Sequence, residues 1–257
     1  MKKLKNFLKK GFNVFGYEIK KKNNEIIEKS FDEILKEKIT KKNPIIIDVG
    51  ANSGQSINRF LKLFENPTIH SFEPITAEFD ILKEKFGTVK NIHLNNFALG
   101  EKRETKLLNI TEKTENSSFN KINLGTDWIK KRSKQYKVRE ENYINQRQKV
   151  DVNTLDAYSD EYNIKNIDIL KIDTQGYEDK VLSGCSNLIN NDKVSVIITE
   201  IIFDNVYDKY FSFSDIEKFI IPNDFRMVGI NLINNNLFSG LLFVADVMYF
   251  NKKHFKI

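Results

Sequence analysis

The sequence predicts an α/β fold with a doubly wound, mostly parallel sheet that ends in an antiparallel hairpin. Short apolar runs alternate with segments of helical periodicity, which is the order found where helices connect parallel strands. The runs contain little polar alternation, and this indicates strands that are covered on both faces. No helix separates the last two runs, so a hairpin is their natural connection.

Each element follows from its own local pattern. Apolar runs predict strands at residues 45–49, 69–72, 92–94, 167–172, 194–199, 225–230 and 241–250. Apolar spacings of three and four predict helices at 55–64, 77–86, 177–189 and 214–221. Asn234, Asn235 and Asn236 supply turn residues for the hairpin. Residues 120–150 fit neither pattern, and a stretch of this length is either a functional lid or a disordered segment.

The composition is that of a globular protein with one main domain and two basic additions. Hydrophobic residues make up 40% of the 257 residues and charged residues 30%, which excludes disordered and fibrous classes. The net charge of +6 is unevenly spread, because residues 1–42 carry +7, residues 120–150 carry +6 and residues 151–257 carry −6. A continuous basic groove for nucleic acid is therefore not favoured. We expect a basic helical arm at 1–42 and a main domain at 43–257 with a basic insert at about 120–150.

The start of the chain has the pattern of a short basic amphipathic helix. Within residues 1–17, apolar side chains recur every three or four positions between lysines, at Leu4, Phe7, Leu8, Phe12 and Phe15. Such a helix either lies on an anionic membrane surface or packs its apolar stripe onto the domain. No apolar run is long enough to span a bilayer, no secretory signal is present, and Cys185 is the only cysteine. We therefore expect a cytoplasmic protein, with peripheral membrane contact as an open alternative.

A turn with two glycines follows the first predicted strand. Its sequence is Asp48-Val49-Gly50-Ala51-Asn52-Ser53-Gly54-Gln55. In doubly wound folds, ligands bind beyond the carboxyl ends of the strands, and glycines in the first turn let a ligand approach the backbone. The spacing of Gly50 and Gly54 differs from that in dinucleotide-binding and P-loop motifs. Glu73 ends the second strand about 20 residues further on, where a carboxylate accepts hydrogen bonds from ribose hydroxyls. These features favour a nucleoside ligand without a pyrophosphate.

With this turn, three further stretches resemble class I S-adenosylmethionine-dependent methyltransferases, and more narrowly the FkbM family. They are residues 96–100 (Asn-Phe-Ala-Leu-Gly), 154–156 (Thr-Leu-Asp) and 167–178, which begins at Ile167 and ends at Glu178. The resemblance covers about residues 44–250 and implies a Rossmann-like fold. Family members often have Val-Glu-Gly where this chain has Thr174-Gln175-Gly176, so a carboxylate that many relatives carry is absent here.

The resemblance implies S-adenosyl-L-methionine as the cofactor. It also implies site residues at the positions of this chain that match the family's motifs. Cofactor-binding residues would be Asp48, Gly50, Ala51, Asn52, Gly54, Glu73, Pro74, Asn96 and Ala98. Catalysis would take place at the end of the fourth parallel strand, with Asp173 as base or as the group that orients the acceptor. Lys171 and Glu178 are further catalytic candidates, and Glu200 at the end of the next strand is placed to join them.

Lys171 requires an acidic partner, because a lysine within a central apolar strand is costly unless it is paired. Strand alternation puts Lys171 on the same side as Asp173. Such a pair lowers the basicity of the acid, so proton abstraction and orientation by Asp173 both stay open. Carboxylates at strand ends are the hard oxygen ligands that divalent cations prefer, but no ligand spacing requires a metal. His70, His93 and His254 are isolated and are expected to be structural.

The resemblance predicts an O-methyltransferase that modifies a hydroxyl of a sugar, a glycan or a related metabolite, for example in polysaccharide modification. In that case, aromatic side chains of the basic insert would stack on a sugar ring, and its cations would meet an acidic or phosphorylated glycan. The alternative is an RNA or protein methyltransferase that binds its substrate through the basic arm and insert. A third reading is a non-catalytic module that uses the fold for binding. The intact turn and Glu73 speak against the module.

Overall fold

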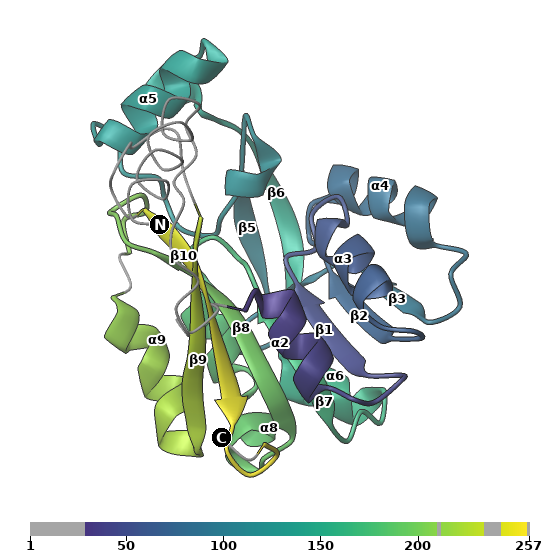
Figure 1. Ribbon diagram of the computed structural model, residues 1–257. Coiled ribbons are helices and arrows are strands. Elements are labelled where there is room, and N and C mark those ends of the chain that lie inside the picture. The colour runs from purple at the N-terminus through teal and green to yellow at the C-terminus, as the bar shows by residue number, and fades with distance from the viewer. Residues whose placement is uncertain (1–28, 210–211, 234–242, 256–257) are drawn as a thin grey trace, which may run out of the picture. The chain divides into compact units, whose positions relative to one another are not determined.

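The computed structural model describes residues 29–209, 212–233 and 243–255 of the chain. Its main sheet has the strand order β3-β2-β1-β7-β8-β10-β9 (Figure 1). The strands are β1 (Ile45–Val49), β2 (Thr68–Phe72), β3 (Ile92–Asn95), β7 (Ile167–Ile172), β8 (Val194–Ile202), β9 (Phe225–Ile233) and β10 (Val244–Asn251). The predicted α/β class is thus confirmed.

The sheet is parallel from β3 to β8 and antiparallel beyond it. β1 pairs in parallel with β2 and β7, and β7 pairs in parallel with β8. β10 pairs antiparallel with both β8 and β9, so the last strand inserts between two earlier ones. The prediction of an antiparallel end to the sheet is confirmed, whereas the turn at Asn234, Asn235 and Asn236 lies outside the described residues. The carboxyl ends of the parallel strands meet at one edge, where a ligand site is expected.

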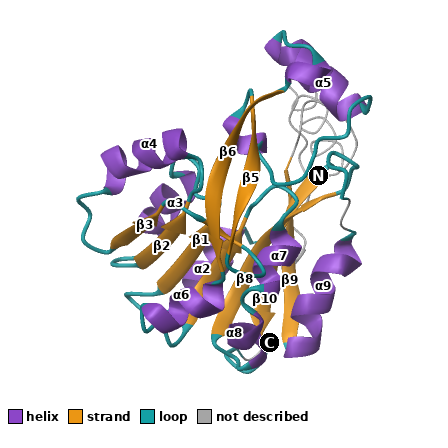
Figure 2. Ribbon diagram, turned by 180° about the vertical axis from the view of Figure 1, so that it is seen from behind, coloured by secondary structure: helices purple, strands orange, loops and turns teal. Residues whose placement is uncertain are grey.

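Helices cover both faces of the main sheet (Figures 1 and 2). One face packs against α6, α7, α8 and α9, and the other against α2, α3 and α4. The alternation shows within β1, where Ile47 belongs to the first core and Ile46 to the second. The helices are α2 (Phe31–Lys38), α3 (Gln55–Leu63), α4 (Thr76–Phe86), α6 (Leu155–Glu161), α7 (Glu178–Ser183), α8 (Ser186–Asn190) and α9 (Phe213–Ile220).

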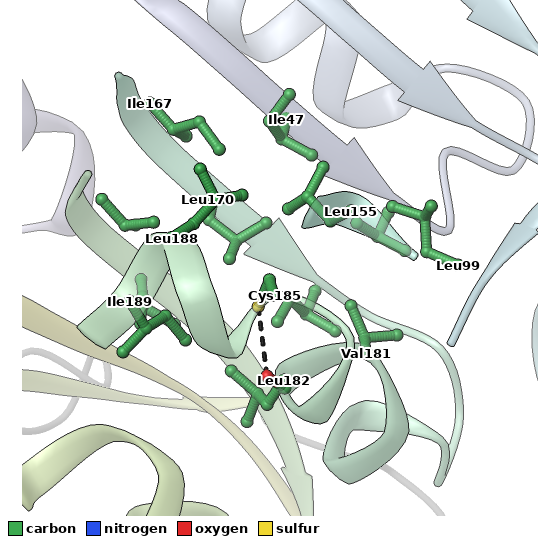
Figure 3. Packing of buried hydrophobic residues seen from close by; sticks show 14 of the residues in the cluster. Ile47, Leu99, Leu155, Ile167, Leu170, Val181, Leu182, Cys185, Leu188 and Ile189 are labelled. Atoms are coloured by element: carbon green, nitrogen blue, oxygen red, sulfur yellow. Dashed lines mark hydrogen bonds between the residues drawn. The ribbon is translucent and has the colours of Figure 1, made fainter. Parts of the chain in front are cut away.

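The segment 177–189 forms two short helices, α7 and α8, where one helix was predicted. The break falls at Gly184, whose backbone lies so close to Gly100 that a Cβ would overlap the Gly100 carbonyl oxygen. Cys185 follows the break and is fully buried, and its thiol donates to the Leu182 carbonyl oxygen (Figure 3). Close packing of two backbones, which hydrophobic periodicity does not reveal, therefore divides the helix.

The described part of the structure contains a second, smaller sheet, not hydrogen-bonded to the main one, that the sequence analysis did not predict. It has the order β4-β6-β5 and comprises β4 (Ala98–Leu99), β5 (Glu104–Thr111) and β6 (Ile144–Asn153). Much of β5 and β6 is exposed, and their buried side chains Leu108, Ile110 and Val150 form a separate small core. Their sequences are largely polar because much of both strands is exposed, so they lack the apolar runs that identified the main strands.

The basic insert at 120–150 is folded. It contains α5 (Asp127–Tyr136), which Thr126 caps by accepting a hydrogen bond from the Ile129 amide, and its last residues begin β6. Trp128 and Tyr143 are 2% and 0% exposed and pack edge to face, with ring centroids 5.6 Å apart. The two rings belong to a small hydrophobic core with Ile129, Val206 and Phe243, so the insert is an ordered part of the structure.

The predicted basic arm ends in a helix that packs on the domain. α2 lies within residues 1–42, and it buries Phe31 and Leu35 in the core that also contains Ile46 of β1. The amphipathic helix predicted at 1–17 lies outside the described residues. None of the described helices has the length and apolar content needed to cross a bilayer.

If α2 is a structural part of the domain, Leu35→Ala lowers the free energy of unfolding by about 2 to 5 kcal/mol, because it leaves a cavity in a closed core. Lys36→Ala, on the exposed side of the same helix, is the matched control and changes it by about 0.5 kcal/mol or less. Urea unfolding followed by circular dichroism measures both. Equal, small effects of the two substitutions would show that α2 is not part of the folded core.

Candidate active site

A cavity of about 420 Å³ opens at the carboxyl ends of β1, β2, β7 and β8. One end is lined by the turn after β1 and the segment after β2, and the other by α5 and the start of β10. Between the two ends lie Lys171, Asp173, Gln175 and Glu200. The second sheet and the segment after β5 cover the cavity with Leu108, Thr114, Glu115, Asn116, Ser117 and Phe119.

The turn after β1 is held against the neighbouring strands. Gly50 has a φ of +80°, and a Cβ at this position would overlap the carbonyl oxygen of Asp173. The amides of Gly50 and Ala51 both donate to the Phe72 carbonyl oxygen, at 3.0 and 3.1 Å. The first turn therefore requires glycine here. Gly54, with a φ of +92°, has a different role, because its α-carbon packs on Phe86 of α4 and it is not among the residues that line the cavity.

Glu73 is a buried carboxylate at the cavity wall, with 4% exposure. Its Oε2 accepts from the Asn52 amide at 2.8 Å, and its Oε1 accepts from the Ile75 amide at 2.9 Å. Burial raises the pKa of Glu73 to about 7, although these two hydrogen bonds oppose the shift. Each oxygen retains a lone pair for a further donor. Glu73 thus joins the turn after β1 to the segment after β2 and stays able to accept from a ligand.

Pro74, Asn96 and Ala98 complete this end of the site in different ways. Pro74 and Ala98 line the cavity directly. Asn96 is not among the lining residues, and its side-chain amide donates to the carbonyl oxygens of Glu73 and Pro74 at 2.9 and 3.3 Å. Asn96 therefore fixes the segment that carries Glu73.

Lys171 is the centre of a buried charge cluster. Its ammonium lies 3.5 Å from Asp48 Oδ1 and 3.4 Å from Asp173 Oδ2, which confirms the predicted pairing with an acid. Burial alone would lower the pKa of Lys171, but the Asp173 and Asp48 carboxylates outweigh it and hold the pKa above its usual value. Lys171 is therefore protonated at neutral pH and cannot act as a base. Asp48 is fully buried behind it and does not line the cavity.

Gln175 bridges the two acids that face the cavity. Its side-chain amide donates to Asp173 Oδ1 at 3.2 Å and to Glu200 Oε2 at 2.5 Å. The Tyr207 hydroxyl lies between two acceptors, 3.1 Å from the Asn116 carbonyl oxygen and 3.3 Å from the amide oxygen of Gln175. Burial, followed by the nearby Asp173 carboxylate, raises the pKa of Glu200 well above its usual range. Gln175 itself is uncharged, so it separates the two acids without adding a third carboxylate to this central part.

Glu178 lies outside the large cavity and is 4% exposed. Its Oε1 accepts from the amide of Thr174 at 2.8 Å and from the Thr174 hydroxyl at 3.0 Å. Burial raises the pKa of Glu178 to about 7. These contacts stabilise the turn after β7, and the catalytic role predicted for Glu178 has no contact with the cavity to support it.

The sequence analysis did not predict two features of the site. The first is the bridging amide of Gln175, which depends on a φ of +56° that turns its side chain between β7 and β8. The second is Arg132 of α5, which lines the far end of the cavity. Arg132 was one of many cations in the insert, and only the fold distinguishes it from the others.

The described residues contain no group of three or more His, Cys, Asp or Glu side chains that would hold a metal ion. His70 lies in the core, where its Nδ1 is 2.8 Å from the Tyr158 hydroxyl. Burial lowers the pKa of His70 to about 4, so it is neutral at physiological pH. These contacts give His70 a structural role.

Several solved structures resemble this fold at low sequence identity. Magnesium protoporphyrin IX methyltransferase from Synechocystis PCC 6803, with bound SAM, is 9% identical at a TM-score of 0.44, over 81% of this chain and 70% of that one. A precorrin-6y C5,15-methyltransferase from Geobacter metallireducens is 10% identical at 0.44, over 90% and 92%. An rRNA methylase from Streptococcus thermophilus is 8% identical at 0.45, over 88% and 98%. No curated protein sequence matches the chain.

The family comparison covers the whole centre of the site. The model of the methyltransferase FkbM domain matches residues 48–227, from Asp48 in β1 into β9. This range includes the turn after β1, Glu73, the Lys171 cluster and Glu200. The resemblance seen in the sequence is confirmed, and the chain belongs to the FkbM family of methyltransferases.

Proposed function

We propose that this methyltransferase transfers a methyl group from S-adenosylmethionine to a hydroxyl of a sugar, a glycan or a related small metabolite. One observation carries the proposal. A single cavity connects the Glu73 end, which suits a nucleoside, with a second end beyond Asp173 that is lined by α5 and the start of β10. Asp173 faces the cavity between the two ends, where the methyl group and the acceptor oxygen would meet.

The residues at the Glu73 end fit the cofactor. The Glu73 carboxylate retains acceptor capacity for the two ribose hydroxyls, while its present bonds to the amides of Asn52 and Ile75 hold it in place. Phe72, Ile75 and Leu99 offer apolar surface for a nucleobase. When bound, the cofactor supplies a methyl group on a positively charged sulfonium.

Asp173 is the group best placed to handle the acceptor hydroxyl. Its side chain is 35% exposed, and Lys171 and Gln175 hold it from two directions. Methyl transfer needs the acceptor oxygen aligned and its proton removed as the new bond forms. Asp173 accepts a hydrogen bond from the hydroxyl, which orients it, and is the base available for the proton. The raised pKa of Glu200 favours its neutral form, which reduces the negative charge beside Asp173.

Glu73→Gln is expected to weaken the binding of S-adenosylhomocysteine by about 1.5 to 3 kcal/mol, because one charged acceptor for the ribose is lost. Glu84→Gln, which alters an exposed carboxylate of α4, is the matched control and leaves the affinity unchanged. Isothermal calorimetry measures both. An unchanged affinity in Glu73→Gln would remove Glu73 from the cofactor site.

The affinity for S-adenosylhomocysteine is also expected to fall as the pH drops below about 7. The pKa of Glu73 is about 7 in the free protein, and ribose hydroxyls bind the ionised carboxylate, so binding below this pH must first release a proton. The loss approaches about tenfold per pH unit on the acid side. Calorimetry from pH 5.5 to 8.5 tests this. A profile that is identical in Glu73→Gln and in the unmodified protein would refute the assignment.

Asp173→Asn is expected to leave cofactor affinity nearly intact and to slow methyl transfer by about 100-fold or more. The assay uses methyl-labelled S-adenosylmethionine with source-cell extract separated into glycan, lipid, small-molecule, nucleic-acid and protein fractions. Asp160→Asn, an exposed acid on α6, is the control. Label that enters the glycan or small-molecule fraction and is lost in Asp173→Asn supports the proposal. Label in RNA or protein would favour the alternative acceptor class.

A further inference from the structure

Arg132 lies at the acceptor end of the cavity. It lines this end together with Trp128 of the same helix, Val206, Phe243 and Val244. The four neighbours are apolar or aromatic, so Arg132 supplies the charge of this part of the wall. Its guanidinium carbon lies 5.9 Å from the centre of the Trp128 ring. A cation on an otherwise apolar wall is costly unless an anion pairs with it.

The Arg132 guanidinium has a hydrogen-bond donor without a partner among the described residues. Its Nε is buried and has no hydrogen-bond partner among the described residues. One terminal nitrogen donates to Gln135 of α5 at 3.1 Å, and no carboxylate of the described residues forms an ion pair with Arg132. A guanidinium presents its donors as a planar fork that matches carboxylate or phosphate oxygens. The partly satisfied fork therefore fits a ligand oxyanion.

The other charges around the cavity do not cancel Arg132. Lys171 is the second basic residue among the described lining residues, and Asp48 and Asp173 already neutralise it. Glu115 pairs with Lys113. Burial and the nearby Asp173 carboxylate raise the pKa of Glu200, which favours its neutral form. Arg132 is thus the positive charge that these neighbours leave available at the acceptor end.

We propose that the acceptor carries an anionic group, a carboxylate or a phosphate, and that Arg132 binds this group while the hydroxyl is presented to Asp173. The inference rests on the proposed methyltransfer and narrows its substrate class to acidic acceptors. It also distinguishes the two substrates by charge, because the cofactor would bring its sulfonium cation to Asp173 and the acceptor would bring an anion to the Arg132 end.

Trp128 makes this site directly observable, because it is the only tryptophan of the chain and it lies beside Arg132. The experiment follows tryptophan fluorescence while sodium glucuronate, glucose 1-phosphate or glucose is added at constant ionic strength. Each titration is run with and without S-adenosylhomocysteine. The acidic sugars are expected to bind saturably and at least about tenfold more tightly than glucose. The glucuronate and phosphate arms distinguish which oxyanion is preferred.

Arg132→Gln is expected to weaken the binding of the acidic sugars by at least about tenfold and to leave the binding of glucose unchanged. Arg132→Lys keeps the positive charge but lacks the planar fork of donors, so it is expected to retain part of the affinity for the acidic sugars. Lys134→Gln removes an exposed charge from the same helix and is the matched control. Thermal melting confirms that each variant is folded.

Equal binding of glucuronate and glucose, or unchanged binding of both acidic sugars in Arg132→Gln, would overturn the inference. Calorimetry with S-adenosylhomocysteine keeps this failure distinct from failure of the proposed function. If S-adenosylhomocysteine binds normally but the acidic sugars bind no better than glucose, only the proposal of an acidic acceptor is ruled out. Absence of cofactor binding removes the proposed function, while the titrations without cofactor still decide whether Arg132 binds anions.

Discussion

The ammonium of Lys171 is the charge on which the rest of the site depends. The register of β1 and β7 puts Lys171 beside Asp48, and Asp173 follows two residues later at the strand end. A buried carboxylate such as Asp48 is tolerated because a cation lies next to it, and loss of the cation would leave an uncompensated charge in the sheet. The same ammonium keeps Asp173 in place beside Gln175. Through these contacts, one lysine links the stability of the sheet to the orientation of the reacting group.

The two ends and the centre of the cavity differ in their electrostatic properties. Glu73, at one end, is held by two backbone amides and has a pKa of about 7, so it is an acceptor that binding can ionise. In the centre, Gln175 donates to both neighbouring acids, which prevents the repulsion that a third carboxylate would cause. Arg132 supplies positive charge at the other end. The proposed sulfonium donor, near Asp173, and the proposed acidic acceptor, at Arg132, would therefore each meet complementary charge.

The elements with a strong local signal were predictable from the sequence. The parallel strands are mostly apolar because both faces of the sheet are covered, and Lys171 stood out because a lysine in such a strand requires an acidic partner. Strands β5 and β6 carry no such signal, since much of both strands is exposed and only a few of their apolar side chains join a small core. The break at Gly184 and the position of Arg132 at the cavity depend on residues distant in the chain. Local patterns thus predicted the scaffold and the cofactor turn, while the acceptor end required tertiary structure.

We infer that one cavity holds the cofactor at Glu73 and directs its reactive sulfur toward Asp173. A crystal structure of the complex with S-adenosylhomocysteine would reveal this arrangement. Both ribose hydroxyls are expected to lie within hydrogen-bond distance of the Glu73 carboxylate, with the sulfur facing Asp173 and Gln175 and the Arg132 end still open. A nucleoside bound elsewhere, with Glu73 contacting only the Asn52 and Ile75 amides, would contradict it.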